Sequence, residues 1–133
     1  SRTLKTESES QFGLQTDAAF ITSRLNYEVR SADTVTTPAG IGQTTSSLVL
    51  TSGSETHTVS LSGNNLVYQK TVGIATTSAN LNTDLTTVSN LSFQALGFVG
   101  GKLSIKINFA LTEVKATQQG NQTKNYEIIT TTR

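Results

Sequence analysis

An apolar stripe in the first 33 residues restricts this part of the chain to one kind of structure. Its members recur at spacings of four, three, four and four residues, which is the period of one face of an α-helix. No proline interrupts the region, and Gly13 is its only glycine. We therefore predict a helix over residues 1–33 whose stripe packs against a sheet. The stripe consists of Leu14, Ala18, Ile21, Leu25 and Val29.

The predicted helix has two parts that differ in character. Residues 1–10 are polar except for Leu4, whereas the stripe starts at Leu14. Gly13 lies between the two parts and weakens a helix by about 1 kcal/mol relative to alanine. We expect the polar part to project beyond the domain as the continuation of a segment that precedes Ser1. The helix should end near Asp33, because proline at position 38 cannot continue it.

Beyond Pro38 the apolar period changes from that of a helix to that of a strand. The clearest alternation runs from Leu103 to Leu111, with polar residues between the apolar ones, as in a half-buried strand. Residues 71–84 hold scattered Thr, Ser and Asn without alternation and are predicted to form a loop. Further strands are expected over residues 47–51, 56–62, 66–70, 91–95 and 126–130, with Gly-Asn turns at 63–65 and 118–122.

These patterns predict a single domain, residues 1–133. Its fold class is α+β, with a long N-terminal helix (1–33) packed on the antiparallel sheet of a β-rich head (34–133). Consecutive strands joined by short turns favour the antiparallel arrangement.

The composition excludes some function classes. Charged residues make up 14% of the chain, the net charge is +1, and Lys and Arg form no cluster, so we expect no nucleic-acid partner. The chain has no cysteine, which rules out disulfides and thiolate metal sites. No stretch is apolar for long enough to cross a bilayer.

The residues that could carry chemistry form no recognisable site. His57 is the only histidine and is predicted to be an exposed strand residue. The spacing of Asn80, Asn82 and Asp84 faintly resembles a Ca²⁺ loop but lacks its glycine and terminal glutamate, so loop capping is favoured. The glycines before Lys102 do not precede a helix, as a phosphate-binding loop requires. We therefore expect no catalytic residue, no cofactor and no metal.

Phe98 and Val99 are unusual because they place two apolar residues at the tip of a predicted hairpin. Loop tips are normally polar. The pair either folds back on the core or forms a contact with a neighbouring subunit.

Three segments together resemble type IV pilin-like proteins, most closely the minor pilins and minor pseudopilins of type II secretion-like systems. Residues 21–32 (ITSRLNYEVRSA), followed by Pro38, are similar to the end of the helix in that family. Residues 88–93 (VSNLSF) resemble the stretch that opens its C-terminal sheet, and residues 130–133 (TTTR) resemble its last strand. The family's cleavage site and transmembrane helix half have no counterpart in these 133 residues.

The resemblance implies a structural subunit of a filament rather than an enzyme. Its partners would be other pilin-like subunits, and it would meet the membrane only through an N-terminal helix half that precedes Ser1. Its location would be the cell envelope or the cell exterior. The alternative is a surface adhesin or a phage or viral fibre domain, whose helix mediates oligomerisation and whose Thr-rich strands face solvent.

Overall fold

The structure is a computed structural model that describes residues 2–114 and 121–133. Side chains are described from Gly13 onward within these ranges, apart from Val99. The turn predicted over residues 118–122 therefore lies largely outside the described residues. Within the described part of the chain, α1 lacks the unbroken apolar stretch that crossing a bilayer requires.

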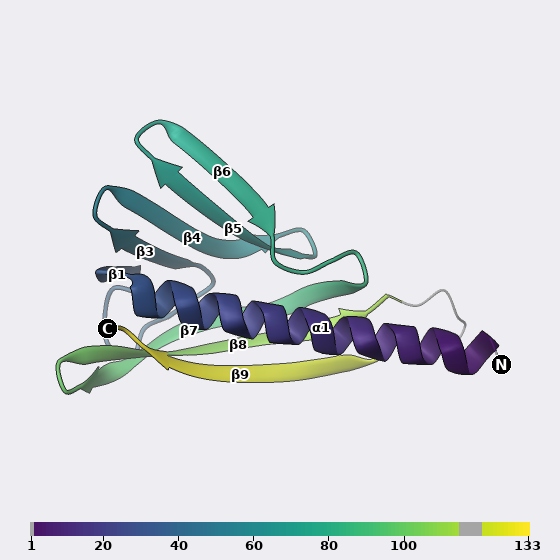
Figure 1. The fold of residues 1–133 in the computed structure, drawn as a ribbon. Coiled ribbons are helices and arrows are strands. Elements are labelled where there is room, and N and C mark those ends of the chain that lie inside the picture. The colour runs from purple at the N-terminus through teal and green to yellow at the C-terminus, as the bar shows by residue number, and fades with distance from the viewer. Residues whose placement is uncertain (1, 115–120) are drawn as a thin grey trace.

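One helix and two antiparallel sheets make up the fold (Figure 1). The helix α1 spans Arg2–Ser31. Sheet A has the strand order β1-β3-β4-β5-β6, and sheet B has the order β2-β7-β8-β9. The strands of sheet A are β1 (Thr34–Thr37), β3 (Leu48–Ser52), β4 (Glu55–Ser62), β5 (Asn65–Val72) and β6 (Ala75–Asn80). Those of sheet B are β2 (Thr44–Thr45), β7 (Thr86–Val99), β8 (Lys102–Glu113) and β9 (Thr123–Thr131).

The predicted fold class, a long helix packed on one antiparallel sheet, is wrong. The protein is mostly β and has two sheets, and the helix is its minor component. Residues 71–84 were predicted to form a loop, but β5 extends to Val72 and β6 occupies residues 75–80. Every residue of β6 is exposed, so this strand has no buried face and no apolar alternation. The antiparallel pairing itself is confirmed.

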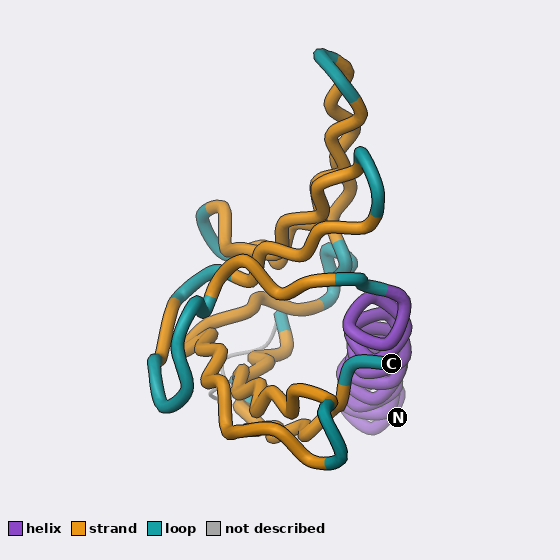
Figure 2. The backbone as a smooth tube through the Cα atoms, turned by 90° about the vertical axis from the view of Figure 1, so that its left-hand side faces the viewer, coloured by secondary structure: helices purple, strands orange, loops and turns teal. Residues whose placement is uncertain are grey.

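Glycine turns ten residues apart build the outer part of sheet A. Gly53, Gly63 and Gly73 have φ angles of +62°, +61° and +64°, a conformation that glycine adopts without a steric penalty. Each begins a two-residue connection between neighbouring antiparallel strands. The last connection closes the β5–β6 hairpin, which projects away from the rest of the molecule (Figures 1 and 2).

The core lies where α1 and the two sheets meet. All five members of the predicted stripe are buried there. Sheet A contributes Leu48, Leu50, Val59 and Leu66, and sheet B contributes Phe93, Ile105, Ile107, Phe109 and Leu111. Gly13 permits a close approach, because a Cβ atom at this position would lie 2.9 Å from Leu85 Cδ1.

Candidate assembly surfaces

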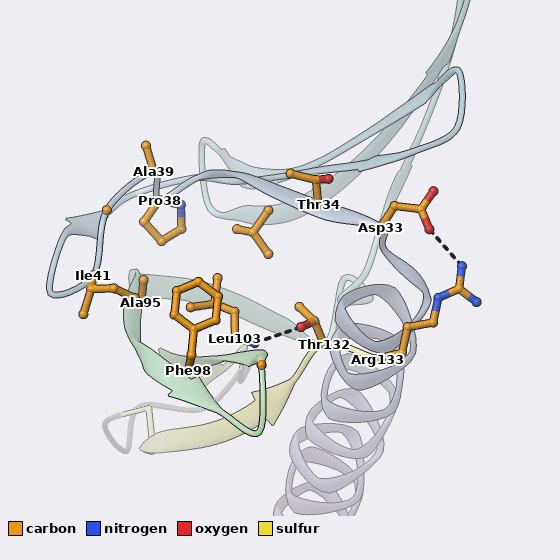
Figure 3. A pocket seen from close by; sticks show the side chains of 13 residues that line it. Asp33, Thr34, Pro38, Ala39, Ile41, Ala95, Phe98, Leu103, Thr132 and Arg133 are labelled. Carbon is orange, nitrogen blue, oxygen red and sulfur yellow. Dashed lines mark hydrogen bonds and ion pairs between the residues drawn. The ribbon is translucent and has the colours of Figure 1, made fainter.

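The head-end pocket is a cavity of about 280 Å³ at the end of the molecule where α1 finishes. Its apolar side is formed by Pro38, Ile41, Ala95, Phe98 and Leu103, which turn toward one space (Figure 3). The β7–β8 hairpin and the segment after β1 supply these residues, and the C-terminal Thr132 and Arg133 complete the lining, so the pocket joins segments that are far apart in the sequence.

Large apolar side chains at the rim of this pocket remain in water. Phe98 is 67% exposed and Ile41 is 54% exposed, although both lie beside buried neighbours. Phe98 is one of the two residues expected either to fold back on the core or to contact a neighbouring subunit; the side chain of the other, Val99, lies outside the described residues. Phe98 lines the pocket without being buried by it, so it stays available for a contact.

An ion pair forms the polar side of the same pocket. Arg133 Nη2 lies 3.0 Å from Asp33 Oδ1, and the backbone N–H of Gly53 donates to Asp33 Oδ2 at 3.0 Å. The hydrogen bond from Arg133, and secondarily the one from Gly53, lowers the pKa of Asp33 below its usual value. These bonds connect the C-terminal residue to the end of α1.

A second exposed surface, the outer helix face, comprises Phe20, Ser23, Arg24 and Tyr27 of α1. Phe20 is 52% exposed and Tyr27 is 62% exposed. The guanidinium carbon of Arg24 lies 5.8 Å from the centre of the Tyr27 ring and 4.6 Å from that of Tyr68, within cation–π range. Arg24 is therefore fixed between an exposed ring and a buried one.

Behind Arg24, a polar cluster ties α1 to sheet A. Glu28 is buried; its Oε1 lies 2.9 Å from Arg24 Nη2, and its Oε2 lies 3.1 Å from His57 Nδ1. His57 Nδ1 also contacts the hydroxyl of Tyr68, and Nε2 lies 3.1 Å from Glu55 Oε1. Burial, and secondarily the charge of Glu28, raises the pKa of Tyr68.

His57 was predicted to be exposed, and this is wrong. It lies in β4 as expected, but its side chain is only 13% exposed. Its partner on the helix, 29 positions earlier in the chain, is Glu28. Sequence distance hid this cluster, because nothing in β4 alone indicates which helix residue it will face.

Among the described residues no group of three or more His, Asp or Glu could hold a metal ion.

Asp17 forms a second tie, between α1 and the loop before β7. Its Oδ2 accepts hydrogen bonds from the backbone N–H of Thr83 (3.0 Å), the Thr83 hydroxyl (2.9 Å) and the Thr86 hydroxyl (2.6 Å). In the same loop, the amide of the buried Asn82 bonds the backbone of Leu66 and of Thr86. The capping role favoured for this loop is thus observed for Asn82, whereas Asn80 belongs to β6.

Comparisons with known proteins identify no relative. No family model matches the chain, and neither a curated protein nor a solved structure matches it.

Proposed function

We propose that this chain is a structural subunit, of the minor class, in a type IV pilus or a type II secretion-like pseudopilus. Its role is to hold its neighbours by packing of the helix and of the β-rich head. The resemblance of residues 21–32, 88–93 and 130–133 to minor pilins and pseudopilins motivates the proposal.

The observation that carries the proposal is the presence of two unlike apolar surfaces. The head-end pocket presents Phe98 and Ile41, and the outer helix face presents Phe20 and Tyr27. A helical filament is built by head-to-tail contacts, in which one patch of a subunit meets a different patch of the next. Exposed aromatic side chains are also the usual anchors of protein interfaces.

The second candidate is a binding domain of an adhesin or of a phage or viral fibre. The head-end pocket supports it, because the cavity combines apolar walls with the Asp33–Arg133 ion pair. Its volume of about 280 Å³ lies at the small end of the range for ligand sites. We prefer the filament subunit because the outer helix face plays no part in such a site.

The test is carried out in the source organism with the complete gene. Phe98→Asp places a charge on the apolar rim, and Leu96→Asp is the matched control, since Leu96 is also exposed in β7 but does not line the pocket. We expect antibody against the chain to label surface filaments or the pseudopilus, and Phe98→Asp to reduce labelled assemblies at least several-fold while Leu96→Asp does not. Normal assembly of the Phe98→Asp subunit would exclude the proposed contact.

A further inference from the structure

Strand β6 is an unprotected sheet edge. It is six residues long, entirely exposed, and contains neither a charged residue nor a proline (ATTSAN). Such an edge presents a row of unpaired N–H and C=O groups to another chain. Lys, Pro, bulges and very short edge strands are the usual features that prevent such pairing with another chain.

The other three edge strands of the described sheets show such features, and where β2 leaves β7 uncovered, two register irregularities interrupt β7. β2 has two residues, and β1 has four, with an irregular register and Pro38 directly after it. β9 carries Lys124 and Glu127 and packs beside α1. The contrast singles out β6 as the edge that another strand would cover.

The register of the β5–β6 hairpin shows which backbone groups are free. Val72 and Ala75 flank the two-residue turn and form the hydrogen-bonded pair that closes it. Because hydrogen-bonded and non-hydrogen-bonded pairs alternate, Thr77 and Ala79 also bond to β5. The N–H and C=O groups of Thr76, Ser78 and Asn80 therefore point outward.

We propose that two copies of this chain pair antiparallel through β6, about a two-fold axis at Ser78. In this register Ser78 faces Ser78 of the second copy, and Thr76 faces Asn80. It is the only antiparallel register that matches all three outward residues with one another. Three pairs that exchange two bonds each give about six backbone hydrogen bonds. No charge is brought into the seam.

The surroundings of β6 favour the same occupant. A cavity of about 250 Å³ lies on the inner side of the edge, lined by Phe20, Arg24, Tyr68, Leu81 and residues 77–80. The half-exposed Phe20 stands beside this edge, where the strand of a second copy would shield it. Thr77 and Ala79 of that copy would bring only small side chains to the mouth of the cavity.

This pairing is separate from the proposed filament role. A two-fold axis perpendicular to the joined sheet reverses every direction within it, so the two α1 helices would point in opposite directions. Neighbouring subunits of one filament point the same way. Because the pair also covers Phe20, which the proposed filament contact needs, it joins free subunits, and its failure would leave the filament proposal intact.

Single cysteines test the register, because the chain has no cysteine of its own. Opposed residues of a hydrogen-bonded pair have Cα atoms about 5.5 Å apart, which is within the range of a disulfide. We expect Ser78→Cys to form a disulfide-linked dimer under mild oxidation. Thr76→Cys is the matched control and should form no disulfide-linked dimer, since Thr76 faces Asn80. Equal cross-linking of both variants would overturn the register.

Sedimentation of the unoxidised chain, from low micromolar to millimolar concentration, tests the pairing itself. We expect a monomer–dimer equilibrium that Ser78→Lys weakens about tenfold or more, because like charges would face each other across the axis. Ser54→Lys makes the same change at an exposed position in the turn between β3 and β4 and should leave the equilibrium unchanged. A chain that stays monomeric throughout, or a dimer insensitive to Ser78→Lys, would rule the pairing out. A β6 edge that pairs only with a different protein would show the first result.

Discussion

The two sheets are joined to the same helix by different kinds of interaction. Sheet B meets α1 through a continuous apolar surface that includes Phe93, Ile107 and Phe109. Sheet A shares that core through β3, β4 and β5, and two polar ties add to it. Glu28 joins α1 to His57 of β4, and Asp17 joins α1 to the loop between β6 and β7. Apolar burial is tolerant of small shifts, whereas hydrogen bonds fix one geometry. Sheet B thus provides most of the apolar contact with α1, and the polar ties determine the orientation of sheet A relative to the helix.

The largest expected effect comes from the apolar side of this comparison. Phe109→Ala removes a buried ring that stacks on Tyr126 at 5.2 Å between centroids, and it should lower the free energy of unfolding by about 3–5 kcal/mol. Phe98→Ala, the same change at an exposed position, should shift it by less than about 0.5 kcal/mol. Denaturant titration of both variants measures the difference. Equal losses would mean that the core has been placed wrongly.

Among the polar ties, we expect Asp17→Ala to cause the largest loss of stability. The substitution leaves three donors from Thr83 and Thr86 without their acceptor, and it should cost about 2–3 kcal/mol. Asp84→Ala in the same loop removes an exposed carboxylate and should be nearly neutral. Hydrogen exchange would refine the result, since the loop before β7 should lose protection before sheet B does. Uniform loss of protection in both sheets would contradict a local tie.

Glu28→Gln should have a smaller effect, because the amide keeps the size of the side chain and can still form hydrogen bonds. Loss of the charge shared between Arg24 and His57 is expected to cost about 1–2 kcal/mol. Glu55→Gln, at a more exposed contact of His57, serves as the control and should cost less than about 1 kcal/mol. A larger loss in Glu55→Gln would reverse the assigned order of the two contacts.

The smallest effect concerns alkaline pH. The pKa of Tyr68 is raised above its usual value of 10.0 by burial and by the charge of Glu28, so the folded state holds this proton more tightly than the unfolded state. The stabilisation that comes from this raised pKa is therefore fully present below pH 10.0, and it is lost as the pH rises through the pKa of Tyr68 in the folded state. Tyr68→Phe should show a shallower alkaline decline, with a remainder from Tyr126, whose pKa burial also raises. An unchanged decline would exclude Tyr68 as a contributor.

The sequence predicts the elements that have one apolar face, and it misses those that are held by polar contacts or by strand pairing alone. The stripe of α1 and the alternation in β8 are visible because each element has one apolar face, and all five stripe residues are buried. β6 was missed because both of its faces are exposed, so its register depends on β5 and on the turn at Gly73 rather than on burial. The Glu28–His57 tie was missed because it depends on which residues of α1 and β4 meet in space. Phe98 drew attention because an apolar residue at a hairpin tip is itself unusual, and its role as a contact stays a prediction.

We propose that the head-end pocket is a contact between subunits. The most direct measurement is photo-cross-linking from position 98, with a benzoyl-phenylalanine in place of Phe98 in the full-length protein in its own cells, and position 96 as the control. We expect position 98 to cross-link to another pilin-like subunit in the filament fraction, identified by mass spectrometry, and position 96 to give much less product. Cross-linking from position 98 to a host receptor or a glycan, or to no subunit in assembled filaments, would contradict the account.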